Sequence, residues 1–131
     1  MDAKVNVMCN ATVGNQIGVI KDVSKLESDE MIDISHVEGQ VMLIVFYGTW
    51  CPHSKQVLKH IQKLYVENEK NWDSKVRVVG LSIDNVKAKQ LQYLKSTQST
   101  AFEHYNVKNG TSKAVQYFGL KRVPTCALID K

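Results

Sequence analysis

The residues that decide the fold are Val41-Met42-Leu43-Ile44-Val45-Phe46-Tyr47-Gly48-Thr49-Trp50-Cys51-Pro52-His53-Ser54. The apolar run that opens this stretch has no polar alternation, which is typical of a strand buried on both faces. After Cys51 the apolar residues take up helical spacing, and Pro52 suits an early helical position because its missing N–H is not needed there. The stretch therefore predicts a buried strand that leads directly into a helix, with Cys51 at the junction.

The junction position of Cys51 predicts a reactive thiol. The first turn of a helix has unpaired backbone N–H groups and carries the positive end of the helix dipole. Both favour the thiolate, which is the nucleophilic form of cysteine. The structural alternative is an inert thiol that only fills space in the core. Ser54 stands where a dithiol enzyme would place its second cysteine.

The predicted helix after Cys51 is amphipathic. Its apolar positions are Val57, Leu58, Ile61, Leu64 and Tyr65. Lys55, Lys59 and Lys63 lie along another stripe, which either adds positive potential near Cys51 or is simply a solvated helix face. His53 would help to stabilise a thiolate when protonated, or would be an exposed residue of the first turn.

Further strands and helices are expected along the rest of the chain. Residues 75–83 are rich in β-branched side chains and predict a second buried strand. Asp84 or Asn85 is expected to cap a helix that runs to about Leu94. The later elements expected are a short strand or loop anchor at Phe102 and Tyr105, a short helix capped by Thr111 or Ser112 and ended by Gly119, and a strand over residues 126–130.

The N-terminal part of the chain has a weaker pattern. Residues 1–14 are expected to be an irregular extension, and residues 17–20 a short strand. Residues 21–40 carry charges and small apolar patches, with a turn at Gly39. The alternation of strands and helices predicts an α/β domain over residues 15–131 with parallel pairing in its first half. An uncovered sheet edge after the last strand leads us to expect either that the natural protein continues past Lys131 or that an adjacent chain covers the edge.

The composition excludes several function classes. The 131 residues are 44% hydrophobic and 23% charged, which suits one ordinary globular domain. The net charge of +4 comes from scattered lysines rather than a basic stripe, so nucleic-acid binding is not expected. We see no transmembrane stretch and no signal peptide in the sequence. We therefore expect a cytoplasmic protein that binds no membrane.

The three cysteines do not form a disulfide framework. Cys9, Cys51 and Cys126 are odd in number and widely spaced, and the close pair Cys51 and His53 is followed by no second Cys/His pair at a zinc-site spacing. We therefore expect no metal and no cofactor. Cys9 is interpreted as an incidental exposed thiol. Cys126 is interpreted as a buried inert thiol, the alternative being a distant resolving partner for Cys51.

Several segments resemble the thioredoxin superfamily in order and spacing. They are residues 45–55, 80–84, 117–125 and 128–130, and the resemblance covers about residues 15–131. The pattern is most similar to the branch of thiol-disulfide proteins related to alkyl hydroperoxide reductases, near tryparedoxin and nucleoredoxin. The resemblance implies a central mixed sheet flanked by helices.

The resemblance also implies roles for individual residues. Cys51 would be the attacking cysteine, and Trp50 would shape the surface that the substrate meets. Pro124 would be a cis-proline facing the cysteine, and Val123 would present its backbone to an extended peptide, with Thr125 beside it. The implied partner is a protein disulfide or thiol, with glutathione as a further candidate.

The chain departs from the family pattern at several points. Ser54 replaces the resolving cysteine, so a disulfide with Cys51 cannot form. Val45 stands where many thioredoxins carry a buried acidic residue, and the last strand and helix of the fold are absent from the sequence. The motif is therefore either a natural monothiol CPHS or a Cys-to-Ser trap of CPHC.

Three functions follow from this pattern. The leading hypothesis is thiol-disulfide exchange by Cys51 alone. The second is a non-catalytic thioredoxin-like module in a larger assembly, which the departures at Ser54 and Val45 favour. The third is peroxide reduction, which Gly48 disfavours because the peroxide-reducing branch has a threonine at that position.

Overall fold

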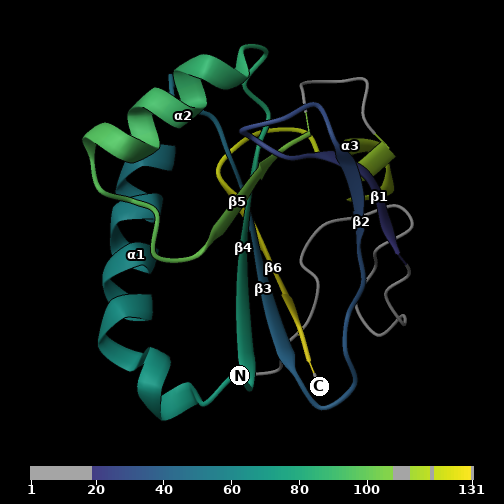
Figure 1. Ribbon diagram of the computed structural model, residues 1–131, viewed down its shortest axis with the longest axis vertical. Helices are drawn as coiled ribbons and strands as arrows, with labels where there is room; N and C mark the ends of the chain where they lie inside the picture. The colour runs from purple at the N-terminus through teal and green to yellow at the C-terminus, as the bar shows by residue number, and fades with distance from the viewer. Residues whose placement is uncertain (1–18, 108–112, 119, 131) are drawn as a thin grey trace.

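Figure 1 shows the computed structural model, which describes residues 19–107, 113–118 and 120–130. The strands are β1 (Ile20–Ser24), β2 (Met31–Ile34), β3 (Val41–Tyr47), β4 (Val76–Ser82), β5 (Glu103–Asn106) and β6 (Thr125–Ile129). The helices are α1 (Pro52–Trp72), α2 (Lys87–Ser96) and α3 (Lys113–Phe118). The predicted buried strand therefore ends at Tyr47, and the helix after it begins at Pro52, as the sequence indicates.

The strands form one mixed sheet in the order β2-β1-β5-β4-β3-β6. β3 pairs in parallel with β4, which pairs in parallel with β5. β6 pairs antiparallel with β3, and β1 pairs antiparallel with both β2 and β5. Among the described strands β6 lies at one edge of the sheet, as expected. The α/β fold with a central mixed sheet is thus confirmed.

Alternate side chains of β3 fill two cores, one on each face of the sheet. Ile44 and Phe46 face a core that includes Val115 and Phe118 of α3. Val45 and Tyr47 face the other core, which α1 covers with Leu58 and Ile61. Figure 1 shows the same layers, with α1 and α2 on one side of the sheet and α3 on the other. Burial on both faces explains why the sequence of β3 is apolar without alternation.

Two expectations about smaller elements are wrong. Among the described residues the strand predicted over residues 17–20 overlaps β1 (Ile20–Ser24) only at Ile20, and the charged segment after it contains β2. The cap of α2 is Val86, because the carboxylate of Asp84 bonds elsewhere. The expected caps at Thr111 and Ser112, the stop at Gly119 and the extension over residues 1–14 lie outside the described residues.

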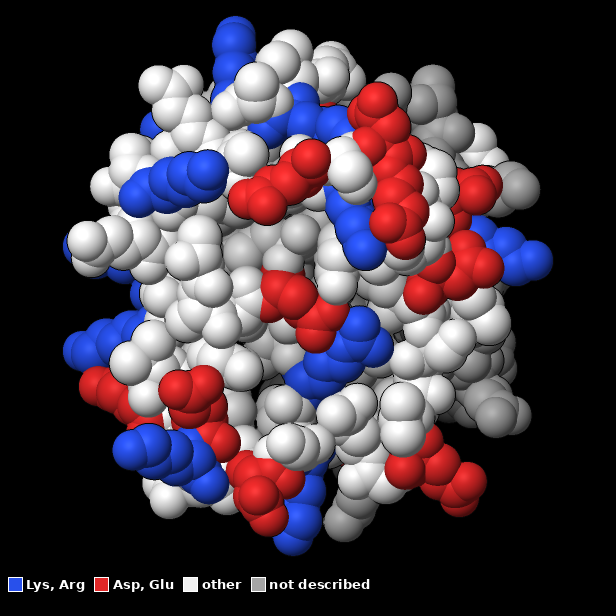
Figure 2. Space-filling view, viewed as in Figure 1, with Lys and Arg blue, Asp and Glu red and all other residues white. Residues whose placement is uncertain are grey.

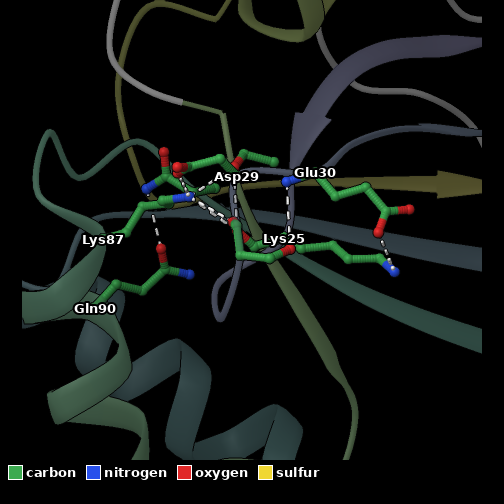
Figure 3. Close-up of polar contacts among 8 residues, drawn as sticks. Lys25, Asp29, Glu30, Lys87 and Gln90 are labelled. Carbon is green, nitrogen blue, oxygen red and sulfur yellow. Dashed lines mark hydrogen bonds and ion pairs between the residues drawn. The ribbon is translucent and has the colours of Figure 1, made fainter.

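A lysine of α2 holds the hairpin formed by β1 and β2. The Lys87 ammonium donates to the Ser24 hydroxyl, the Lys25 and Ser28 carbonyls and the Asp29 carboxylate, over distances of 2.8–3.2 Å. Figure 3 shows the hairpin loop folded around this ammonium group. In the described sheet the register of β1 and β5 places Ser24 opposite Asn106, and Lys87 adds hydrogen bonds from α2 to the same hairpin.

Candidate functional site

Cys51 is the N-cap residue of α1. Its backbone is extended (φ −97°, ψ 117°), its N–H donates to the Gly48 carbonyl, and its own carbonyl accepts the first helical bond from Lys55. Its side chain is partly exposed and free of any disulfide. The thiol therefore lies at the open N-terminus of a helix, with solvent on one side.

The pKa of the Cys51 thiol is lowered from its ordinary value. The largest contributions are the backbone N–H and the hydroxyl of Ser54; desolvation opposes them, and the backbone N–H of His53 lowers the pKa by a smaller amount. These groups stabilise negative charge on sulfur, as the unpaired N–H groups of a first helical turn do. The side chain of His53 is exposed, and its proposed role remains a prediction.

Ser54 is completely buried although it lies in the first turn of α1. Its hydroxyl accepts a hydrogen bond from the Gly48 N–H at 3.2 Å and also stabilises the Cys51 thiolate. One serine side chain thus connects the end of β3 to the thiol. Ser54 therefore has a structural function in this turn that a disulfide with Cys51 would not explain.

Trp50 lies beside the thiol on the surface, with 58% of its area exposed. Its indole folds back over Gly48, where an added Cβ would lie 2.4 Å from two ring carbons. Beside it is a cavity of about 530 Å³ lined by Thr49, Trp50, Ile83, Asp84, Asn85, Val86 and Lys89. The tryptophan is therefore placed to contact a molecule that approaches Cys51.

The loop before β6 faces the thiol from another part of the chain. The Val123–Pro124 peptide bond is cis, the conformation that the resemblance implies. The Cys51 Sγ lies 3.9 Å from the Val123 carbonyl oxygen, and the Thr125 hydroxyl donates to the Arg122 carbonyl at 2.7 Å. The structure thus brings Val123 next to Cys51 and its chain neighbour Trp50. What each residue does there remains a proposal.

Asp84 fixes the segment before Cys51 through hydrogen bonds. The sequence pattern did not predict this role for Asp84. Its carboxylate accepts from the backbone N–H and the hydroxyl of Thr49, and from the hydroxyl of Ser82. Tyr47 and Ser82 are opposite each other at the ends of the parallel strands β3 and β4. Continuing that register by two residues would have brought Thr49 and Asp84 together.

The two remaining predicted positions lie in the sheet. Cys126 is opposite Val45 in the pairing of β6 with β3 and packs against the core under α1. Burial raises the pKa of the Cys126 thiol, which suits an inert thiol. Val45 is completely buried in the same core and carries no ionisable group.

Neither a metal site nor a membrane helix is found in the part of the chain that the structure describes. No group of three or more His, Cys, Asp or Glu side chains converges there as metal ligands would. None of the described helices has the length and apolarity needed to span a membrane.

The geometry of this site agrees with comparison to known families. A family model described as thioredoxin-like matches residues 39–131. The chain belongs to the thioredoxin-like family. A relative, the thiol-disulfide oxidoreductase ResA of Oceanobacillus iheyensis, is 26% identical over 100 residues. The match covers 76% of this chain and 50% of ResA, so the chain spans about half the length of this relative.

Solved structures share the fold of this thioredoxin-like chain. StoA from Bacillus subtilis has a TM-score of 0.67 and 21% identity, over 86% of this chain and 80% of that one. A thiol-disulfide oxidoreductase from Bacteroides fragilis has a TM-score of 0.69 and 17% identity, over the same shares of the two chains. At these identities the likeness shows the fold alone, and the expected thioredoxin-like fold is confirmed.

Proposed function

We propose that this chain is a thiol-disulfide exchange protein that uses Cys51 as its only nucleophile. One observation carries the proposal: Cys51 is partly exposed at the N-terminus of α1, and neighbouring N–H and O–H groups lower its pKa. A lowered pKa increases the thiolate fraction near neutral pH, and the thiolate is the form that attacks disulfides.

The proposed reaction is a single exchange. The Cys51 thiolate attacks one sulfur of a substrate disulfide, a new S–S bond forms between them, and the second sulfur leaves as a thiolate with the bonding electron pair. Cys51 is thereby oxidised to a mixed disulfide, and the leaving sulfur is reduced. Ser54 offers no thiol to displace the bound substrate, so the intermediate waits for an external thiol.

The neighbouring residues are proposed to position the substrate. Trp50 would contact it through the exposed indole, and Val123 would present its carbonyl to an extended peptide backbone. Pro124 and Thr125 would keep that loop facing the thiol, and Ser54 and His53 would stabilise the thiolate.

Glutathione or a second thiol of the partner protein is proposed to resolve the mixed disulfide. Both are available in the cytoplasm, which is the compartment we propose. We place this activity in a thioredoxin-like domain over residues 15–131, near the tryparedoxin and nucleoredoxin branch. Ser54 would be a natural monothiol feature or a Cys-to-Ser trap of CPHC, and a trap would accumulate the mixed disulfide.

The second candidate is a non-catalytic thioredoxin-like module in a larger assembly. The buried Ser54 hydroxyl favours it, because that residue already serves the local fold without a second thiol. In this case the exposed Trp50 surface would bind a partner without sulfur chemistry. Replacement of Cys51 by Ser would then leave the cellular role intact.

The pH dependence of Cys51 alkylation distinguishes the two candidates. Iodoacetamide labelling across a pH series, with mass spectrometry of the peptide that contains Cys51, gives the apparent pKa. A value well below about 8.5 supports exchange chemistry. A thiol that stays unlabelled, or titrates at the ordinary value, would reject the enzyme and leave the binding module.

A further inference from the structure

A second cavity lies between α1 and α2, starting one helical turn from Cys51. Its volume is about 390 Å³, and its lining residues are Lys55, Gln56, Lys59, Gln62, Tyr93, Thr97 and Ser99. It is separate from the cavity beside Trp50, since the two share no lining residue. The thiol chemistry proposed above does not use it.

Hydrogen bonds hold the walls of this cavity. The Gln62 side chain donates to the Gln98 carbonyl and accepts from the Ala101 N–H, which ties α1 to the loop after α2. The Thr97 and Ser99 hydroxyls bond to each other at 2.8 Å. The Lys55 ammonium lies 5.5 Å from the centre of the Tyr93 ring, which forms the wall opposite. The recess is therefore built by specific contacts.

The charge of the cavity has one sign. Two of its lining residues are lysines and none is acidic. Neither Lys55 nor Lys59 forms one of the ion pairs found among the described residues. On the left of Figure 2, over α2 and the upper part of α1, the visible charged atoms are blue, and red atoms appear lower, towards the end of α1. The recess suits a carboxylate.

The spacing connects the cavity to the thiol. Cys51, Lys55 and Lys59 follow one another at intervals of four residues, so they lie along one face of α1. An α-helix rises about 1.5 Å per residue, which places the lysines roughly 6 and 12 Å along the helix axis from Cys51. An extended peptide advances about 3.3 Å per residue, so a side chain two to four residues from a reacting cysteine would reach them.

We propose that the cavity between α1 and α2 binds acidic side chains of the protein substrate, and so selects partners with Asp or Glu two to four residues from the reacting cysteine. This inference rests on the proposed function and names its substrate class. The sulfur chemistry is unchanged: Cys51 takes one sulfur of the substrate disulfide, and the other leaves as a thiolate. The lysines bind the acidic peptide beside the bond that breaks.

Two matched peptides test this preference. Each carries one cysteine as its disulfide with neutral 2-thiopyridine, and they differ only in having Glu or Gln two and four residues away. Attack by Cys51 releases thiopyridone, which is followed by absorbance, and mass spectrometry locates the adduct. At low salt the wild type should react roughly fivefold faster with the Glu peptide, and high salt should shrink the ratio.

Two variants with equal charge changes locate the effect. Lys55→Gln/Lys59→Gln should bring the Glu-to-Gln rate ratio close to one. Lys63→Gln/Lys70→Gln removes two exposed lysines of α1 that do not line the cavity, and should keep the wild-type ratio. A ratio cancels any change in the intrinsic reactivity of Cys51, because both peptides meet the same thiol.

The outcomes separate this inference from the proposed function. Equal rates for the two peptides in the wild type, or an equal loss of preference in both variants, would overturn the acidic preference while leaving exchange intact. If neither peptide labels Cys51, the exchange function fails. In that case, fluorescence anisotropy measures the binding of labelled, disulfide-free Glu and Gln peptides to the Cys51→Ser protein. Tighter binding of the Glu peptide, lost when Lys55→Gln/Lys59→Gln is added, supports the proposed role of the cavity. Equal binding of the two peptides rejects it.

Discussion

At the scale of single residues, the interpretation of Ser54 differs most between the sequence and the structure. In the sequence it marks a missing cysteine, whereas in the fold its buried hydroxyl bonds the Gly48 N–H and supports the Cys51 thiolate. The sequence could reveal the junction position of Cys51, because the strand and helix patterns meet there. It could not reveal the second bond of Ser54, because that bond depends on how the turn folds back.

Removing the Ser54 hydroxyl should weaken the thiolate. Ser54→Ala leaves the backbone N–H groups in place but removes one donor to sulfur, so the pKa of Cys51 should rise towards its ordinary value. It also leaves the Gly48 N–H without its partner, at a cost of about 1–3 kcal/mol in the free energy of unfolding. Alkylation rates across pH measure the first effect and urea unfolding the second. Ser35→Ala, at an exposed site, is the control; an unchanged alkylation profile would contradict the role given to the hydroxyl.

Gly48 should control the position of the Trp50 indole. A Cβ at Gly48 would clash with the far edge of the ring, but this ring is exposed and can move aside. Gly48→Ala should therefore shift the tryptophan emission while changing the free energy of unfolding by less than about 1 kcal/mol, as is usual for substitutions at the surface. The measurement uses a Trp72→Phe background with selective excitation of tryptophan, so that Trp50 is the only tryptophan that emits. Unchanged emission would show that the position of the ring does not depend on Gly48.

At the scale of elements, patterns with strong hydrophobic periodicity predicted the structure best. β3, β4 and α1 bury long apolar faces, so their sequences show their type clearly. The hairpin was missed because β1 has an irregular register between Ile20 and Val23, and Asp22 there has a positive φ of 61°. An irregularity of this kind breaks the two-residue period on which strand prediction depends. The capping prediction for α2 failed because Asp84 bonds Thr49 and Ser82 instead.

The hairpin should depend on Lys87. Lys87→Met keeps the length of the side chain but removes the ammonium that bonds the Ser24–Asp29 loop, so the free energy of unfolding should fall by about 1–3 kcal/mol. Amide hydrogen exchange in β1 and β2 should also become faster than in β3. Lys95→Met, at an exposed position of the same helix, should change neither quantity much. Equal exchange rates in wild type and Lys87→Met would reject the attachment.

At the scale of the whole molecule, a buried polar network crosses the sheet beneath the site. The Gln90 amide donates to the Tyr47 hydroxyl, and Asn106 donates to both Gln90 and the Asp84 carbonyl. The Tyr47 hydroxyl also contacts Nδ1 of His104 at 2.9 Å. Sequence patterns of apolar residues do not predict such a network, because its members come from β3, the loop after β4, β5 and α2 and meet only in the fold.

His104 should make the protein sensitive to acid. Burial lowers the pKa of His104 to about 4, although the Ser99 carbonyl and Glu103 oppose the effect. Its unfolded value is about 6.5, so between these two values the unfolded chain binds more protons and stability falls as the pH falls. The loss from pH 7 to pH 4 should reach about 3 kcal/mol. Glu103, whose pKa Arg77 lowers against the effect of burial, adds its loss at lower pH.

Urea unfolding at a series of pH values measures this loss, and NMR titration of the His104 ring measures the pKa directly. His104→Asn retains an acceptor for the Tyr47 hydroxyl without an ionisable ring, so its stability should vary less between pH 6.5 and 4. Comparing slopes with pH, rather than stability at one pH, separates ionisation from any loss of packing against Phe102. Equal slopes in wild type and His104→Asn would mean that His104 is not the group through which acid destabilises the fold.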